Sequence, residues 1–374
     1  MTSGPSTRAA PPRARLGVSA PLSGRGTVLG REMAQAARLA VEEANAAGGL
    51  PGGTVELIER DDRGEEEAGL AVARTFADDP SVLAVIGPYN SNVALAAAPV
   101  YRDARLALVG PIVSNPALTE SGWDTVFRFT NRDDETAAAI AGHLVRALGK
   151  RRAVLVAVAT TYGRSMTDRF AEAFARAGGA ALSRHEVAEG ETGFDALAES
   201  LPKEMDVLFY GGTYEGAPLL AALRRRGRPQ LFAAGDGCWD RPNFLEPAGR
   251  AAEEGEGVLV LSACPEPGVV PGAREMIGRY ERRFGPVVNY AVNAYDAAAL
   301  TLAALRAAAT GQTVPDRGAV LEALRRAEHR GIAYPEPARW DGRGDNRAAV
   351  TALHVVRNGR FVQVAMVPGN GGRE

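Results

Sequence analysis

Short apolar runs alternate with amphipathic segments along most of this chain, in two successive series. The first series has four runs typical of buried strands, each bounded by glycine or proline: Leu16–Ala20, Val55–Glu59, Val82–Gly87 and Leu106–Gly110. Helical patterns follow the first three runs, at Leu29–Ala46, Glu65–Phe76 and Ser91–Arg102. This alternation predicts βαβ units, in which parallel strands form a sheet with helices on both faces.

A second series repeats the pattern. Its strand-like runs are Ala153–Ala159, Val207–Gly211, Leu231–Gly235 and Val258–Leu261, and its helices lie near Ser165–Ala177, Tyr214–Arg226 and Pro271–Phe284. Further elements then follow, at Ala291–Ala309, Val314–Ala327, Ile332–Trp340, Val350–Val356 and Phe361–Val367, with Asn358-Gly359 as a hairpin turn. The 374 residues exceed one ordinary core, so we expect two α/β lobes to which the chain returns.

Composition excludes several classes of function. The 43 basic and 45 acidic residues are well mixed, which gives no electrostatic footprint for nucleic acid. No apolar run approaches the ~18 residues of a membrane span, so direct membrane insertion is not expected. Residues 1–12 and 368–374 are predicted to be disordered tails. The start lacks an apolar signal region, so the expected location is cytoplasmic as written, or extracytoplasmic if a signal has been removed.

The two cysteines, Cys238 and Cys264, fit no metal or redox spacing. Free thiols are favoured over a single disulfide, because a chain of this length does not need a disulfide for stability.

Ligands of open α/β sheets bind at the carboxyl ends of the strands. After two of the first-series strands come Pro88-Tyr89-Asn90-Ser91 and Pro111-Ile112-Val113-Ser114, each entering a helix. Hydroxyls at two helix N-termini suit a carboxylate, although both serines could simply be helix caps. The glycine-rich turn Gly24, Gly26, Gly30 is one residue too long for a dinucleotide fingerprint.

The second series places an isolated carboxylate, Asp236, at a strand end. It could pair with a ligand cation flanked by Tyr162, with Thr213 and Tyr214 at the neighbouring strand end. The alternative is an Asx turn that only stabilises the loop.

Signs of catalysis or of a cofactor are few. The four histidines are dispersed, no serine-nucleophile or phosphate-loop motif occurs, and the doublets Asp61-Asp62 and Asp133-Asp134 are expected to be solvated. We therefore expect no metal, no cofactor and no enzymatic activity.

The chain resembles the type I periplasmic binding proteins, in particular the leucine/isoleucine/valine-binding branch, from about Arg15 to Val367. The resemblance rests on an ordered set of short stretches: Ala20–Gly24, Asn45–Gly53, Asp61-Asp62, Val85–Gly87 with Ser91, Pro111–Thr119, Phe127-Arg128, Tyr162-Gly163, Tyr210–Gly212 and the turn at 235–237.

This resemblance implies two Rossmann-like lobes with parallel sheets, joined by three hinge crossings. Lobe 1 would comprise residues 13–131 and 257–337, and lobe 2 residues 132–256 and 338–367. It also implies residue roles. Ser91 and the Ser114 loop would bind a carboxylate, Asp236 an ammonium, and Tyr162 would close over the ligand. By matched position Leu29 and Tyr290 would line the side-chain pocket, with Tyr89 and Asn90 nearby; Ile112, Thr213 and Tyr214, which follow strand ends, complete the candidate site.

Some residues depart from the family pattern. The family's acidic residue is commonly glutamate, and Thr213 stands where branched-chain binders carry an aromatic residue. With Asn90, and with Glu215 near the mouth, these departures favour a ligand more polar than leucine.

The expected function is therefore binding of a small polar solute, an amino acid or a derivative, as the substrate-binding component of an ABC importer with a permease partner. The alternatives are a cytoplasmic amide-type sensor and an enzyme built on the same scaffold.

Overall fold

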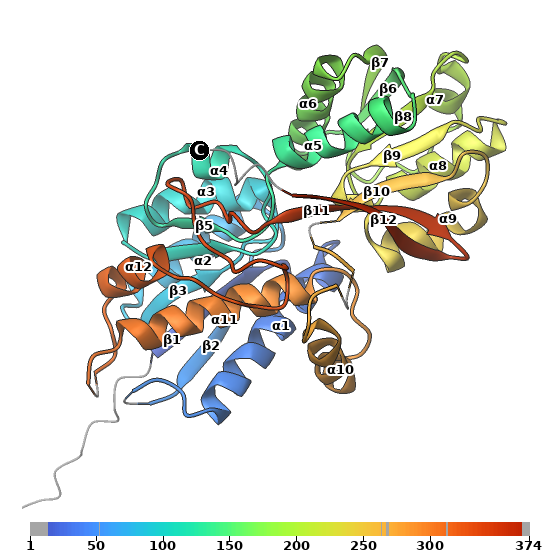
Figure 1. The fold of residues 1–374 in the computed structure, drawn as a ribbon. Coiled ribbons are helices and arrows are strands. Elements are labelled where there is room, and N and C mark those ends of the chain that lie inside the picture. The colour runs from blue at the N-terminus through green and yellow to red at the C-terminus, as the bar shows by residue number, and fades with distance from the viewer. Residues whose placement is uncertain (1–13, 52, 263, 267–268, 312, 369–374) are drawn as a thin grey trace, which may run out of the picture.

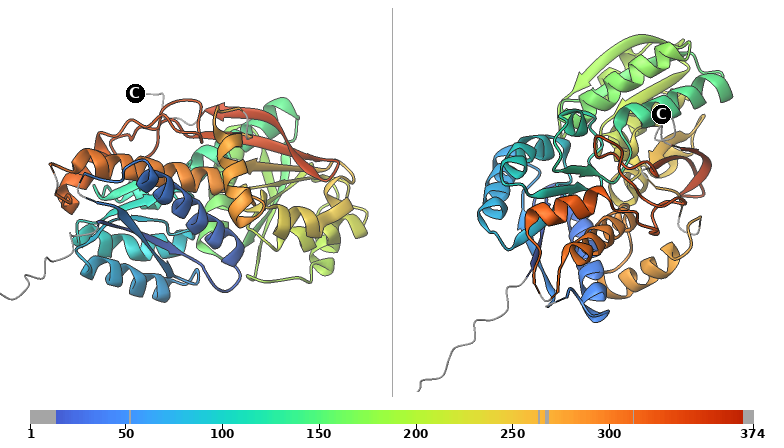
Figure 2. Two further views of the ribbon diagram at one scale, coloured as in Figure 1. Left: turned by 90° about the horizontal axis from the view of Figure 1, so that it is seen from below. Right: turned by 60° about the vertical axis from the view of Figure 1, so that its left-hand side comes forward.

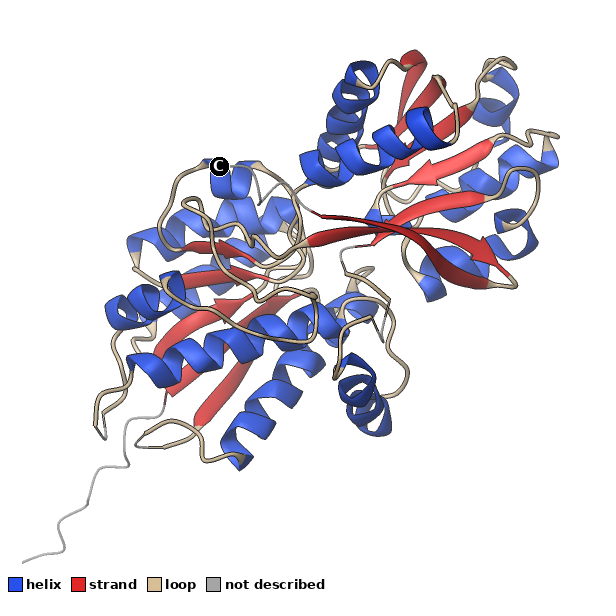
Figure 3. Ribbon diagram, in the orientation of Figure 1, coloured by secondary structure: helices blue, strands red, loops and turns tan. Residues whose placement is uncertain are grey.

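The computed structural model describes residues 14–51, 53–262, 264–266, 269–311 and 313–368, which form two α/β lobes (Figure 1). Each lobe has one central sheet with helices on both of its faces (Figure 3). This arrangement confirms the predicted fold class.

The first lobe is built on a five-stranded sheet in the order β2-β1-β3-β4-β5, and all its strand pairs are parallel. Its strands are β1 (Ala14–Ala20), β2 (Val55–Asp61), β3 (Val82–Ile86), β4 (Ala107–Gly110) and β5 (Val126–Arg128). Its helices are α1 (Thr27–Ala46), α2 (Glu66–Asp78), α3 (Ser91–Asp103), α4 (Ala117–Glu120), α10 (Ala273–Phe284), α11 (Ala291–Ala308) and α12 (Arg317–Arg325).

Alternation of side chains along the strands explains why helices cover both faces of this sheet. Ala107 and Val109 of β4 belong to the core cluster shared with α1, α11 and α12, whereas Leu108 belongs to the cluster shared with α2 and α3. Helices α11 and α12 therefore cover one face of a sheet whose strands all lie within residues 14–128.

The second lobe has a seven-stranded sheet in the order β12-β11-β10-β9-β8-β6-β7. Its strands are β6 (Arg152–Val158), β7 (Ala180–Val187), β8 (Val207–Gly211), β9 (Leu231–Ala234), β10 (Val258–Ser262), β11 (Val350–Arg357) and β12 (Arg360–Pro368). Its helices are α5 (Asp133–Gly142) with a π-helical extension (His143–Ala147), α6 (Thr161–Arg176), α7 (Asp195–Ser200), α8 (Gly216–Arg225) and α9 (Glu246–Ala248), and short helical turns span Asp236–Cys238, Arg241–Leu245 and Gly249–Ala252.

The second sheet is parallel from β7 to β10 and antiparallel at the β10–β11 and β11–β12 pairs. The predicted hairpin turn is confirmed, since Asn358 and Gly359 join β11 to β12 with positive φ angles of 51° and 65°.

Two predictions about elements are wrong. Ile332–Trp340 is not a strand: around it the chain makes only isolated bridges, between His329 and Ala338 and between Trp340 and Asn346. Pro335 and Pro337 remove two of the N–H donors that a strand there would need. Strand β7 was not predicted, because its residues are exposed or half-buried at the edge of the sheet.

The predicted lobe boundaries need two corrections. Val258–Ser262 was expected in lobe 1, but it pairs as β10 with β9 and β11 in the second sheet. Residues 338–349 were expected in lobe 2, but Ala338, Ala348 and Ala349 are buried in the core of the first lobe. The three crossings therefore lie between β5 and α5, between β10 and α10, and just before β11. Strand β11 runs from the crossing into the second lobe (Figure 2).

Cys238 and Cys264 are both buried and unbonded, as predicted. Within the described part of the chain, no helix is long and apolar enough to cross a membrane.

Candidate functional site

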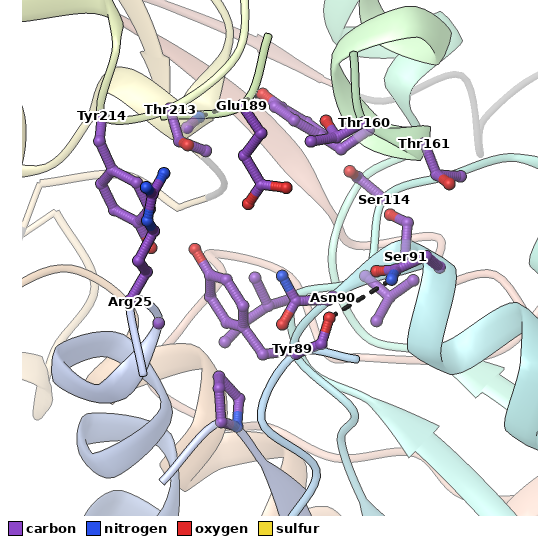
Figure 4. A pocket seen from close by; sticks show the side chains of 18 of the residues that line it. Arg25, Tyr89, Asn90, Ser91, Ser114, Thr160, Thr161, Glu189, Thr213 and Tyr214 are labelled. Carbon is purple, nitrogen blue, oxygen red and sulfur yellow. Dashed lines mark hydrogen bonds between the residues drawn. The ribbon is translucent and has the colours of Figure 1, made fainter. Parts of the chain in front are cut away.

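A cavity of about 380 Å³ lies between the lobes, where the carboxyl ends of strands from both sheets meet. This volume falls within the range of about 300–1,000 Å³ that is typical of small-molecule sites. First-lobe residues face second-lobe residues across it, as Figure 4 shows for Tyr89, Asn90 and Ser91 opposite Thr160, Glu189 and Tyr214.

The structure brings most of the predicted site residues to this one cavity. Those that line it are Tyr89, Asn90, Ser91, Ile112, Ser114, Tyr162, Thr213, Tyr214, Asp236 and Tyr290. Leu29 does not line it, because this residue faces inward from α1 and is 3% exposed in the core of the first lobe. The prediction of Leu29 as a pocket residue is therefore wrong.

The first wall is formed by Tyr89, Asn90 and Ser91, which connect β3 to α3. Ser91 is the first residue of α3, and Asn90 occupies the cap position without a side-chain cap bond. The Ser91 hydroxyl is therefore not used as the predicted N-cap. Gly87 shapes the turn: its φ is +106°, and a Cβ there would lie 2.1 Å from the carbonyl oxygen of Ser19.

The loop after β4 forms the second part of this wall and carries Ile112, Val113 and Ser114. Ser114 is 7% exposed, and its carbonyl oxygen accepts a hydrogen bond of 2.9 Å from the Asp133 amide. Asp133 is fully buried and accepts a hydrogen bond of 3.2 Å from the Ser165 hydroxyl. Burial raises the pKa of Asp133 to about 7, while hydrogen bonds from Ser114 and Ser165 oppose that rise.

The opposite wall presents Asp236, which begins the helical turn after β9. The Tyr162 hydroxyl donates to Asp236 Oδ1 at 2.7 Å, and the Tyr290 hydroxyl donates to Asp236 Oδ2 at 3.1 Å. Burial raises the pKa of this carboxyl, and the two tyrosine hydroxyls partly offset the rise. Tyr290 belongs to the first lobe, so this hydrogen bond spans the cleft.

Glu32 of α1 holds the segment that carries Tyr290. The backbone N–H groups of Val288, Asn289 and Tyr290, just before α11, all donate to its carboxylate. Glu32 is 2% exposed, and desolvation raises its pKa to about 7 although these N–H groups favour the charged form. Glu32 was not among the predicted site residues.

The pKa of Glu32 predicts a pH dependence of stability. An unfolded glutamate releases its proton near pH ~4.3, whereas folded Glu32 keeps its proton up to about pH 7. Between these values the folded protein binds the extra proton, so rising pH destabilises it by up to about 1.4 kcal/mol per unit through this group. Above pH 7 the contribution levels off.

We expect the free energy of unfolding of a Glu32→Gln variant to rise relative to wild type as pH increases from 5 to 7.5. Urea unfolding at several pH values measures this difference. His354, whose pKa burial lowers to about 4, contributes the opposite slope in both proteins and cancels. A difference independent of pH would contradict the assignment.

The cavity also has charged residues that were not predicted. Arg25, Arg63 and Arg164 line it together with Glu66 and Glu189, and Figure 4 shows Glu189 pointing into the cavity and Arg25 beside Tyr214. Glu189 follows β7, a strand that was not predicted, and Arg25 lies in the glycine-rich turn, which had been compared with a dinucleotide fingerprint.

Two expectations about acidic residues are wrong. Glu215 is not at the mouth: it is 2% exposed and accepts hydrogen bonds from the Gly190 amide at 2.7 Å and the Tyr210 hydroxyl at 3.2 Å. The aspartate doublets are not simply solvated, since Asp62 and Asp133 are fully buried. Buried carboxylates that accept several N–H or O–H bonds cannot be told from exposed ones by spacing alone.

Comparison with known proteins shows the family to which the chain is similar. The sequence profile of a periplasmic binding protein family matches residues 14–365. An "Amino acid binding protein" of Pseudomonas aeruginosa is 25% identical over 332 residues, which cover 88% of this chain and 86% of that protein. "Leu/Ile/Val-binding protein homolog 3" of Brucella melitensis is 28% identical over 311 residues, covering 83% and 82%.

Among solved structures, the leucine-binding protein LivK of Thermotoga maritima superposes with a TM-score of 0.85 at 26% identity. The match covers 95% of this chain and 99% of that one. The similarity therefore extends over both lobes and the three crossings between them.

Proposed function

The chain belongs to the periplasmic binding protein family, and from this premise we propose that it is the amino-acid-binding component of an ABC importer. The lobes would close on one ligand molecule and present it to a permease. The observation that carries the proposal is the buried Asp236, held by two tyrosine hydroxyls at one wall of a cavity that has Ser91 and Ser114 at the other.

The serine wall suits the ligand carboxylate. Ser91 begins a helix of 13 residues, so the amide groups of its first turn lack intrahelical partners and carry partial positive charge. The Ser91 and Ser114 hydroxyls both border the cavity. Hydrogen bonds to a carboxylate are charge-assisted and stronger than those between neutral groups.

Asp236 suits the ligand ammonium. Burial makes ionised Asp236 unfavourable while the cleft is empty, as its raised pKa indicates. A bound ammonium would restore the ionised form, so the ligand gains affinity from a carboxylate that two tyrosines already orient.

Contacts between the two lobes across the cleft support the proposed closure. Besides the hydrogen bond from Tyr290 to Asp236, the Asn289 side chain donates to the Trp239 carbonyl oxygen. At the mouth, Arg25 of the first lobe lies against Gly190 of the second, since a Cβ on Gly190 would lie 2.2 Å from Arg25 Nη1. A ligand that touches both lobes would add to these contacts only in the closed state.

We propose binding without turnover. The described residues that line the cavity include no histidine, the side chain that most often acts as a general base, and no cysteine or lysine. The aliphatic lining residues are few, Pro21, Ile112, Val113 and Ala159, whereas most of the other lining residues carry a charge, an amide or a hydroxyl group. This lining favours a polar ligand side chain over that of leucine.

A thermal-shift screen against the amino acids tests the proposal. A ligand present at 100 times its dissociation constant should stabilise the protein by about 2.7 kcal/mol, and polar amino acids should give larger shifts than leucine. If no amino acid shifts the melting temperature, amino-acid binding is ruled out.

A further inference from the structure

Arg128, at the end of β5, is an arginine whose side chain is completely buried. It does not line the cavity and takes no part in the function proposed above. A guanidinium is costly to bury unless all its donors are used, so its partners indicate why it is there.

Its hydrogen bonds converge on the loop that carries Ser114. Nη1 donates to the carbonyl oxygens of Val113 at 3.2 Å and Asn115 at 2.7 Å. Nη2 donates to the Thr119 hydroxyl at 2.5 Å and, more weakly, to the Pro116 carbonyl oxygen at 3.5 Å. The guanidinium therefore holds both ends of the segment from Val113 to Thr119.

Because the peptide bond is planar, the hydrogen bond to the Val113 carbonyl also sets the direction of the Ser114 N–H. In a trans peptide the C=O and the following N–H point in opposite directions. The Val113 carbonyl points to Arg128, so the Ser114 N–H points away from Arg128. Val113 and Ser114 line the cavity whereas Arg128 does not, so the loop lies between the guanidinium and the ligand space.

Arg128 is also tied to the hinge. Its Nε donates to Asp345 Oδ1 at 2.7 Å, and its backbone N–H and C=O bond to Gly344 and Asn346 in the segment just before the third crossing. Asp345 Oδ2 accepts hydrogen bonds from the Thr119 hydroxyl at 3.0 Å and from Arg132 Nη1 at 3.2 Å, and Arg132 lies in the first crossing.

We propose that Arg128 is a positioning residue for the carboxylate site. It fixes the Ser114 loop so that the Ser114 amide faces the ligand carboxylate, and through Asp345 it links that loop to two hinge crossings. This inference rests on the proposed amino-acid function and deepens it.

The test compares two ligands in each variant. The ratio of the dissociation constant of the ligand's C-terminal amide to that of the amino acid itself measures carboxylate recognition. Calorimetry supplies both constants for wild type and for Arg128→Lys, which keeps the charge but cannot donate to all these partners at once. We expect the ratio to fall by about tenfold or more.

Arg317→Lys is the matched control. The Arg317 guanidinium also donates to several backbone carbonyls of the first lobe, including those of Phe76, Val82 and Ala104, but these lie near the amino ends of β3 and β4, at the other end of the strands from the cavity. This variant should lose stability and keep the wild-type ratio. Asp345→Asn, a milder change beside Arg128, should lower the ratio by a smaller factor and serves if Arg128→Lys does not fold.

The outcomes separate the claims. If Arg128→Lys folds and its ratio is unchanged, the positioning role is overturned. The same holds for Asp345→Asn if only that variant folds. In either case, amino-acid binding by the wild type leaves the proposed function intact. An equal fall in Arg317→Lys also overturns the positioning role, because the effect would then be general loosening of the lobe. Failure of wild type to bind any amino acid overturns both.

Discussion

Replacing Asp236 with alanine is expected to weaken amino-acid binding by roughly 30-fold to 5,000-fold, equivalent to about 2–5 kcal/mol. The side chain is 7% exposed, and the hydroxyls of Tyr162 and Tyr290 direct it at the cleft. Without it, closure of the lobes would bury the ligand ammonium without the carboxylate that the two tyrosines orient. Isothermal titration calorimetry measures the loss.

A nearby carboxylate provides the control. Asp240 is 1% exposed but does not line the cavity, and it accepts hydrogen bonds from the backbone and side chain of Asn243. Asp240→Asn should therefore reduce stability and leave affinity within a few-fold of wild type. If Asp236→Ala binds as tightly as wild type, the ammonium site lies elsewhere.

The double variant Ser91→Ala, Ser114→Ala is expected to weaken binding by about 100-fold or more. Each hydroxyl borders the cavity, and a hydrogen bond to a charged group contributes about 1.5–3 kcal/mol. The helix amides at the same wall remain, so some carboxylate recognition should survive.

Each single variant should show part of this loss, and the C-terminal amide of the ligand should be affected less than the amino acid. Ser81→Ala is the control, because the Ser81 hydroxyl bonds to Asp79 just before the amino end of β3, at the other end of this strand from the cavity. Equal affinity in the double variant and wild type would show that these serines only support the local backbone.

The sequence was sufficient for much of the fold because its strands are buried on both faces. Val82–Ile86 is entirely apolar and entirely buried, so a continuous apolar run marked it well. β7 escaped because one of its sides has no neighbouring strand and its residues are polar and exposed. At Ile332–Trp340, apolar residues pack on the first-lobe core without strand pairing, so their hydrophobicity misled the prediction.

The site was predictable where residues follow strand ends, since Ser91, Ser114 and Asp236 all do. Glu32 and Arg128 were not predictable from local pattern. Glu32 contacts residues more than 250 positions away, and Arg128 reaches Asp345 217 positions away. The boundary error at β10 has a similar origin, because sheet membership depends on its pairing with β11, nearly a hundred residues later.

The central claim, that the cleft recognises both charged groups of an amino acid, is tested most directly on wild-type protein. The amino acid that gives the largest thermal shift should be titrated by calorimetry beside its deaminated and its decarboxylated analogues. The account predicts that each analogue binds at least about 30-fold more weakly than the amino acid. Equal affinity for either analogue would contradict it.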